Sequence, residues 1–236
     1  MVLAAGEGIR LRPMTTDVPK PMVPVRGRPL LEHTVASLAR QGVRDLVLNL
    51  HHCPETVRSH FGTGEQWGAH IQYSPEPRLL GTAGALTPWR AFFDSTFLVV
   101  YGDNLTTCDL SRLCRFHESA HALVSVALYW RDDPRQSGIA DVDDHGRIRR
   151  FLEKPREDEL FSRWVNAGLL VLEPGVIDLI PRDRPSDFGR ELLPRWIAEG
   201  RPVFGYKMSS SERLWWIDTP DDIARVHEEL TEREKT

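Results

Sequence analysis

The fold of this chain is decided near its start, by the stretch Leu3-Ala4-Ala5-Gly6-Glu7-Gly8-Ile9-Arg10-Leu11-Arg12-Pro13 and the following Pro19-Lys20-Pro21-Met22. An apolar start runs into small residues and glycines, which let backbone N–H groups approach a ligand closely. Two cations follow within a short reach, Arg10 and Lys20, and the prolines on either side of Lys20 stiffen its loop. The stretch therefore predicts a strand that leads into a loop for a phosphate chain.

The same stretch argues against a dinucleotide-binding fold and thus against a nucleotide-dependent oxidoreductase. Gly6 and Gly8 would begin such a fingerprint, but Leu11 stands where its third glycine belongs, and no acidic residue closes a second strand to hold a ribose. A triphosphate or a phosphoryl group in transfer is instead stabilised by cations that are held in place beforehand. A solvated surface loop would account for either cation alone, but it accounts poorly for the whole string.

Composition indicates one folded domain without a nucleic-acid surface. The 236 residues are 41% hydrophobic and 27% charged, and 30 basic against 34 acidic residues give a formal charge of −4. We expect a single domain over residues 1–236 and no broad nucleic-acid footprint. The three cysteines match no zinc or disulfide pattern, and neither a signal peptide nor a long apolar run is present. We therefore expect a cytoplasmic protein with no membrane partner.

Alternating patterns predict an α/β domain with a mainly parallel sheet. Apolar runs predict strands over residues 1–5, 46–50, 70–74, 97–101, 123–129, 165–172 and 203–207. Helical spacing predicts helices over residues 30–38, 54–61, 84–93, 109–119, 188–198 and 220–234. A hairpin of residues 139–142 and 147–152 interrupts the alternation and predicts a small β-rich insertion in the second half. In such sheets ligands lie at the carboxyl ends of the strands, where the glycine loop and Gly102-Asp103 both fall.

The opening stretch resembles the signature of the sugar-1-phosphate nucleotidyltransferases, also called nucleotide-sugar pyrophosphorylases. The resemblance implies a Rossmann-like (GT-A-like) three-layer α/β/α fold. It also implies that Arg10 and Lys20 are the catalytic cations that hold the nucleotide phosphates and the sugar phosphate. Ile9 stands where the family has threonine, so one hydroxyl contact is lost or replaced. The residues of this loop that the resemblance assigns to nucleotide binding are Leu3, Ala4, Ala5, Gly6 and Gly8.

Two further stretches of the first half resemble the family in the same order. The string Glu76-x-x-x-Leu80-Gly81-Thr82-Ala83-Gly84-Ala85-Leu86 is similar to its base-recognition loop, which assigns Glu76, Gly81 and Thr82 to the nucleotide. Alternatively, Thr82 caps a helix that begins near Ala83. Gly102-Asp103 resembles the element whose aspartate holds Mg²⁺ beside the nucleotide, so Asp103 is assigned to both.

The second half resembles the part of the family that binds the sugar phosphate. Glu153-Lys154-Pro155 and Asn166-Ala167-Gly168 are similar to elements in which carboxylate, ammonium and amide groups meet the sugar hydroxyls and the phosphate. Asp187-Phe188 resembles a pair found before a helix, although N-capping by Ser186 or Asp187 explains it almost equally well. The residues assigned to the sugar phosphate are Gly138, Glu153, Lys154, Asn166 and Gly168.

The last match is imperfect and leaves two alternatives for the second metal ligand. The family has Trp-x-Asp-x-Gly-Thr-Pro, and this chain has Trp215-Trp216-Ile217-Asp218-Thr219-Pro220. If Trp216-x-Asp218 is retained, Asp218 is the second ligand. If Thr219-Pro220 is retained without a gap, Trp216 occupies the metal position and Asp218 is a helix cap. We favour Asp218, because a tryptophan cannot coordinate Mg²⁺.

The resemblance implies that an oxygen of a sugar 1-phosphate attacks the α-phosphorus of a nucleoside triphosphate, with Mg²⁺ as cofactor and pyrophosphate as leaving group. Leu80-Gly81-Thr82-Ala83-Gly84 is most similar to the guanylyltransferases for mannose 1-phosphate and D-glycero-D-manno-heptose 1-phosphate, which favours GTP. Thymidylyl, cytidylyl or uridylyl transfer to another sugar or cyclitol phosphate stays open, as does a catalytically silent, sugar-nucleotide-binding regulatory subunit. A homodimer or homotetramer is compatible with the sequence. The sequence does not decide the pathway or whether the native start lies upstream of Met1.

Overall fold

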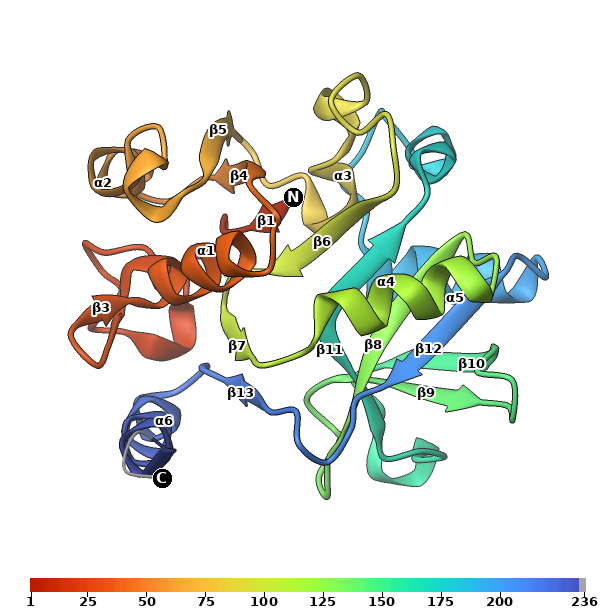
Figure 1. The fold of residues 1–236 in the computed structure, drawn as a ribbon. Helices are drawn as coiled ribbons and strands as arrows, with labels where there is room; N and C mark the ends of the chain where they lie inside the picture. Colours follow the sequence, from red (N-terminus) through yellow and green to blue (C-terminus); the bar gives the residue numbers. More distant parts are fainter. Residues whose placement is uncertain (234–236) are drawn as a thin grey trace. The chain divides into compact units, whose positions relative to one another are not determined.

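The structure, a computed structural model, describes residues 1–233 (Figure 1). The chain divides into two units, and each is built from separate segments of sequence. Unit 1 comprises Met1–Leu79, Tyr101–Thr107 and the described part of Leu214–Thr236, and unit 2 comprises Leu80–Val100 and Cys108–Arg213. Because the chain passes repeatedly between the units, neither is a continuous piece of sequence. The single catalytic domain stays a prediction, and each unit is described by itself.

Unit 1 contains a parallel sheet of β1 (Val2–Leu3), β4 (Asp45–Leu50) and β5 (His70–Pro75), with β4 in the middle (Figure 1). The helices α1 (Leu30–Arg40) and α2 (Pro54–Phe61) connect these strands along the chain. The apolar residues of β4 are at most 2% exposed, which agrees with the continuous apolar run typical of parallel strands. The first strand covers only Val2–Leu3 of the predicted residues 1–5.

A second group of elements in unit 1 joins distant parts of the sequence. The strands β7 (Asn104–Thr106) and β13 (Leu214–Trp216) pair antiparallel, and α6 (Pro220–Arg233) follows β13. A short hairpin of β2 (Pro24–Val25) and β3 (Arg28–Pro29) contributes to the same region. Its hydrophobic cluster consists of Val25, Leu30, Leu105, Trp215, Ile217 and Val226, with Ile223 and Leu230 packed against it. These four strands were not predicted, because two or three residues are too few to show a period of two.

Unit 2 is organised around β11 (Trp164–Leu172), whose residues are buried from Val165 onward. This strand pairs antiparallel with β6 (Phe97–Tyr101), β8 (Val124–Trp130) and β9 (Gly138–Val142). The strand β12 (Val203–Lys207) runs parallel to β8, and β10 (Ile148–Glu153) completes the predicted hairpin with β9. The helix α4 (Leu110–Ser119) contacts β8, β11 and β12, and α5 (Leu193–Ala198) contacts β10 and β12 (Figure 1).

One predicted helix is interrupted, and another begins as a π-helical turn. Residues 84–93 do not form one helix: α3 covers Gly81–Gly84, and a 3-10 turn covers Thr87–Trp89. Pro88 explains the break, because it lacks an N–H and restricts the residue before it. Residues 188–198 begin as a π-helical turn, Phe188–Leu192, before α5, where Pro194 removes another donor. The helix expected over 220–234 is present to Arg233, and Glu234 lies outside the described residues.

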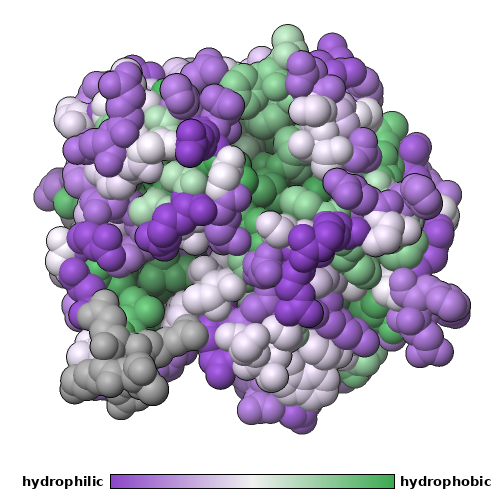
Figure 2. Space-filling model, viewed as in Figure 1, coloured by the Kyte–Doolittle hydropathy of each residue, from purple (hydrophilic) through white to green (hydrophobic). Residues whose placement is uncertain are grey.

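The surface is mixed in character. Hydrophilic residues cover much of the face seen in Figure 2, with apolar residues between them. The large apolar side chains that stay exposed are Ile9, Met14, Leu79, Trp130 and Leu160. Among residues 1–233, no helix has both the length and the apolar character needed to cross a bilayer.

Candidate active site

The glycine loop of unit 1 leaves the sheet directly after β1. The backbone N–H of Ala4 donates to Oδ1 of Asn49, 2.7 Å away, and Gly8 has a left-handed backbone with φ of 66°. A Cβ at Gly8 would lie 2.7 Å from Cβ of Lys20, so this position requires glycine for its φ and for the close approach of the lysine. The Thr15 hydroxyl donates to the Gly8 carbonyl at 2.7 Å, which holds the loop in this shape.

Four of the predicted residues meet in one cluster of charges, which we call the cation–carboxylate cluster. It consists of Arg10, Lys20, Asp103 and Asp218. The Lys20 ammonium lies 2.8 Å from Asp103 Oδ2 and 2.7 Å from Asp218 Oδ1, and Arg10 Nη2 lies 2.9 Å from the same Asp218 oxygen. Lys20 is 6% exposed, whereas the Arg10 side chain is 54% exposed. The cluster thus holds one buried cation, one solvent-facing cation and two carboxylates.

The pairing of β7 with β13 brings the two carboxylates together. Asp103 immediately precedes β7, and Asp218 follows β13 by two residues. Because the strands are antiparallel and Trp216 is paired with Asn104, the start of one strand lies beside the end of the other. Asp218 therefore forms ion pairs with Arg10 and with Lys20, which is also the partner of Asp103. The group that joins the cluster is the carboxylate of Asp218 and not the indole of Trp216.

The start of α6 fixes the backbone at Asp218. Asp222 Oδ2 accepts hydrogen bonds from the N–H groups of Asp218 at 3.1 Å and Thr219 at 2.9 Å, and the Thr219 hydroxyl accepts from the Asp222 N–H at 3.3 Å. This reciprocal pattern is a capping box, which satisfies the first N–H groups of a helix. Burial raises the pKa of Asp222, but hydrogen bonds from Arg225 and Thr219 lower it more, and the net pKa is lowered. The capping role that the alternative gave to Asp218 is thus filled by Thr219 and Asp222.

The charges of the cluster suit both phosphates and a divalent cation. Burial alone would lower the pKa of Lys20, but Asp103 and Asp218 outweigh it through charge and hydrogen bonds, so the pKa is raised and the side chain stays protonated. Two carboxylates that converge on one point are the donor set that Mg²⁺ takes in proteins, usually with waters and substrate phosphates as the other ligands. Asp103 and Asp218 therefore fit a magnesium ion. Within residues 1–233, no group of three or more acidic, histidine or cysteine side chains is gathered for a metal.

A chain of buried polar contacts connects the glycine loop to Glu76, which directly follows β5. Asn49 Nδ2 donates to Glu76 Oε1 at 2.9 Å, while Asn49 Oδ1 accepts from Ala4. Asn49 and Glu76 are each only 4% exposed. Sequence reasoning missed Asn49, although a polar residue inside the apolar run Leu46-Val47-Leu48-Asn49-Leu50 was a usable signal, because buried polar groups need partners.

In unit 2, Glu153 is held in a narrow space at the end of β10. A Cβ at either Gly138 or Gly189 would lie 2.5 Å from Glu153 Oε2, so an alanine at either position would displace the end of this side chain. Burial raises the pKa of Glu153, and the nearby Asp187 raises it further, against smaller opposing effects of Lys154 and Arg190. The structure thus brings Gly138 and Glu153 together, as opposite residues of the hairpin.

The loop that carries Gly81 and Thr82 is bound to the segment before α5. The Thr82 hydroxyl donates to Asp187 Oδ2 and accepts from the Phe188 N–H, both at 2.9 Å. The N–H groups of Ala83 and Gly84 donate to the Ser186 carbonyl. Thr82 therefore does not cap α3, and the capping alternative for it is wrong. Asp187 does cap its helix, because it accepts from the Arg190 N–H at 2.8 Å.

The remaining predicted sugar-phosphate residues lie in and beside β9, β10 and β11. Asn166 is 8% exposed, and its amide oxygen accepts from the Gly168 N–H at 2.9 Å, where the pairing of β11 with β8 is irregular. Gly168 has φ of 71°, which explains the glycine of the Asn-x-Gly element. Lys154 is exposed, and its N–H donates to the Ser137 carbonyl.

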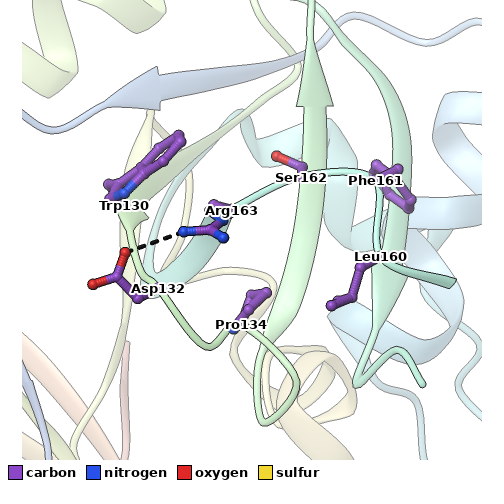
Figure 3. Close-up of a pocket in the computed structure, with 7 residues that line it drawn as sticks. All are labelled: Trp130, Asp132, Pro134, Leu160, Phe161, Ser162 and Arg163. Atoms are coloured by element: carbon purple, nitrogen blue, oxygen red, sulfur yellow. Dashed lines mark hydrogen bonds and ion pairs between the residues drawn. The ribbon is translucent and has the colours of Figure 1, made fainter. Parts of the chain in front are cut away.

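A separate cavity of about 530 Å³ lies in unit 2 (Figure 3). None of the predicted site residues lines it. Arg163 and Asp132 form an ion pair of 3.2 Å at this cavity, and Figure 3 shows them near Trp130. The lining residues are Trp130, Asp132, Pro134, Leu160, Phe161, Ser162 and Arg163.

An α/β fold with a glycine loop after its first strand, followed by fixed cations and paired carboxylates, defines a phosphate-handling protein of the nucleotide-binding type. The chain belongs to the nucleotidyl transferase family, whose sequence pattern matches residues 1–233. The predicted resemblance to sugar-1-phosphate nucleotidyltransferases and the predicted fold class are both confirmed.

Relatives with different nucleotides are similar to this chain. A mannose-1-phosphate guanylyltransferase of Mycobacterium tuberculosis is 36% identical over 234 residues, which cover 98% of this chain and 64% of the relative. A UTP–glucose-1-phosphate uridylyltransferase of Synechocystis sp. is 34% identical over 232 residues, which cover 92% of this chain and 59% of the relative. The chain thus spans about three fifths of the length of these relatives.

Solved structures show the same fold. HddC from Yersinia pseudotuberculosis superposes with a TM-score of 0.82 at 23% identity, and 97% of each chain is covered. The structure of HddC complexed with GMP-PN gives a TM-score of 0.81 at 24% identity over the same shares of the chains.

Proposed function

We propose that this chain is a sugar-1-phosphate nucleotidyltransferase that transfers a nucleoside monophosphate, most favourably from GTP, to a sugar 1-phosphate of the mannose or heptose type. Pyrophosphate is the leaving group. The observation that carries the proposal is the cation–carboxylate cluster, in which a buried, protonated Lys20 lies beside a glycine loop and between two carboxylates. In a loop that is merely solvated, an ammonium group is not expected to be buried between two aspartates, because removing charges from water costs free energy.

The residues of unit 1 handle the triphosphate in this proposal. The backbone N–H groups of the loop from Leu3 to Gly8 bind phosphate oxygens, and Arg10 and Lys20 neutralise charge at the α-phosphate and the leaving pyrophosphate. Asp103 and Asp218 would hold Mg²⁺, which when bound orients the triphosphate and offsets its charge. The attacking phosphate oxygen is already an anion, so no general base is required. Orientation of the two substrates then accounts for much of the rate.

The residues of unit 2 bind the sugar phosphate in this proposal. Glu153 and Asn166 meet the hydroxyl groups, and the exposed Lys154 meets the phosphate. The glycines at 138 and 189 support this role, because a Cβ at either position would lie 2.5 Å from the Glu153 carboxylate and would displace it. Thr82 and Gly81 contribute to the nucleotide mainly through the loop that they shape, since the Thr82 hydroxyl already has two partners.

Guanylyl transfer is favoured by the string Leu80-Gly81-Thr82-Ala83-Gly84 and by the similarity to a mannose-1-phosphate guanylyltransferase. The similarity to a uridylyltransferase keeps other nucleotides as the alternative. We propose that the enzyme depends on magnesium and works in the cytoplasm. None of the three cysteines, all within the described residues, forms a disulfide, which agrees with a reducing compartment. A homodimer or homotetramer is proposed as its assembly and is tested by light scattering.

Pyrophosphate release tests the proposal. The protein is incubated with Mg²⁺, a panel of sugar 1-phosphates and each of GTP, ATP, UTP, CTP and dTTP. We expect release with GTP and a mannose- or heptose-type phosphate. Release with another pair would reassign the substrates, and nucleotide binding without release from any pair would identify a silent regulatory subunit. Absence of both binding and release would refute the proposed function.

A further inference from the structure

Three consecutive residues hold Glu76, two at the end of β4 and one directly after it. Asn49 donates to the Glu76 carboxylate, the Leu50 carbonyl accepts from the Glu76 N–H at 2.7 Å, and His51 Nδ1 lies 2.7 Å from the Glu76 carbonyl oxygen. Both the side chain and the backbone of Glu76 are therefore fixed by one short segment of the chain. One of the three contacts reaches the carboxylate, and the other two hold the backbone from which that side chain extends.

The same strand end also fixes the glycine loop. Asn49 Oδ1 accepts from the Ala4 N–H at the position where β1 ends, and Leu3 is the last residue of β1 paired with Asn49. At Ala4 the hydrogen bond to a side-chain amide thus replaces the backbone hydrogen bonds of the sheet, and the chain leaves the sheet there. His51 Nε2 in addition lies 3.9 Å from Glu7 Oε1, within the loop.

The two ends of the Asn49 amide are not interchangeable. Its oxygen must accept, because the partner is an N–H, and its nitrogen must donate, because the partner is a carboxylate oxygen. An aspartate would keep the acceptor but would bring a second carboxylate to within 2.9 Å of Glu76, in a place that is almost fully buried. An alanine would remove a partner of the Ala4 N–H and one partner of the Glu76 carboxylate.

We infer that Asn49 is a positioning residue for nucleotide binding, which sets the orientation of the Glu76 carboxylate relative to the glycine loop. The inference rests on the proposed function, because it takes Glu76 as a group that meets the nucleobase. Asn49 does not contact the nucleotide. It acts through Glu76, and its removal therefore weakens nucleotide binding only while the carboxylate at 76 is present.

A double-mutant cycle on the full chain tests this coupling. The variants are Asn49→Asp, Glu76→Gln and the combination of both, in which donor and acceptor are exchanged and the hydrogen bond forms again. The control is Ser74→Ala, which removes a buried hydroxyl opposite Asn49 on β5 that takes no part in these contacts. Binding of GTP and UTP with Mg²⁺ is measured by calorimetry, together with Tm and the KM and kcat of pyrophosphate release.

We expect Asn49→Asp and Glu76→Gln each to weaken nucleotide binding at least about tenfold, and the double variant to be no weaker than Glu76→Gln. The KM for the sugar phosphate changes less than about threefold in each, and Ser74→Ala resembles the wild type. Losses that multiply in the double variant, or a lower Tm with unchanged nucleotide binding, would overturn the inference. If Asn49→Asp does not fold, Asn49→Ser replaces it in the cycle. Failure of the wild type to bind any triphosphate would instead overturn the proposed function.

Discussion

Lys20 offers the sharpest test of the cation–carboxylate cluster, because its removal should have opposite effects on catalysis and on metal binding. In Lys20→Met the side chain keeps a similar length but loses its charge. Turnover should fall at least about tenfold, roughly 1.4 kcal/mol of barrier, since one of the two cations proposed for the phosphates is gone. At the same time Asp103 and Asp218 lose their shared ammonium partner and are left to attract another cation.

The expected gain in metal affinity follows from Coulomb's law. Mg²⁺ binds carboxylate oxygens at about 2.1 Å, and Lys20 Nζ lies 2.7 Å from Asp218 Oδ1 and 2.8 Å from Asp103 Oδ2. A divalent ion on these oxygens would therefore lie at most about 5 Å from the ammonium. Repulsion at that distance is about 1.7 kcal/mol even with the dielectric constant of water, which corresponds to more than tenfold in affinity.

The measurement is a titration of the nucleotide-free protein with Mg²⁺ by calorimetry or with Mn²⁺ by electron paramagnetic resonance. Lys207→Met serves as the matched control, because that lysine lies over the Trp164 ring in unit 2, outside the cluster. We expect tighter metal binding in Lys20→Met and no change in the control. Equal metal affinities in the variant and the wild type would refute the reasoning that Lys20 compensates the two carboxylates in the absence of substrate.

Three further predictions concern the metal ligands, the helix cap and the sugar-binding residues. Asp218→Asn should lower turnover and Mn²⁺ affinity at least about tenfold, while Trp216→Phe leaves both within about twofold; the reverse pattern would transfer the metal position to residue 216. Asp222→Ala should remove about 1 kcal/mol of stability at neutral pH. Because the pKa of Asp222 is lowered, that contribution is present above the unfolded pKa of about 3.9 and is lost at lower pH. Unfolding at pH 7 and pH 3 checks this, and an equal difference at both would contradict it. Gly189→Ala places a Cβ 2.5 Å from the carboxylate proposed for the sugar, so the KM for the sugar phosphate should rise at least about fivefold. The control is Gly175→Ala, where nothing lies within 4 Å, and equal KM values in the two variants would count against the assignment.

The predicted strands and the hairpin of β9 and β10 are confirmed because each is a local pattern of apolar residues. The helix predicted over residues 84–93 fails for a local reason as well, since Pro88 removes a backbone donor within the predicted span. The helix predicted over residues 188–198 is present, with a π-helical turn at its start. The strands β7 and β13 could not be predicted. Each has three residues, and the strand with which it pairs lies more than a hundred residues away in the sequence.

The sequence by itself determined the elements whose chemistry is local. These are the glycine loop, the lysine between prolines, and the carboxylate that follows an apolar strand. Only the tertiary structure decided that Lys20 lies between Asp103 and Asp218, which are 83 and 198 residues away from it. It also decided that Asn49 joins the loop to Glu76. The physical reason is that such contacts depend on the register of long-range strand pairing and on where helix α6 begins, and neither leaves a periodic mark on the sequence.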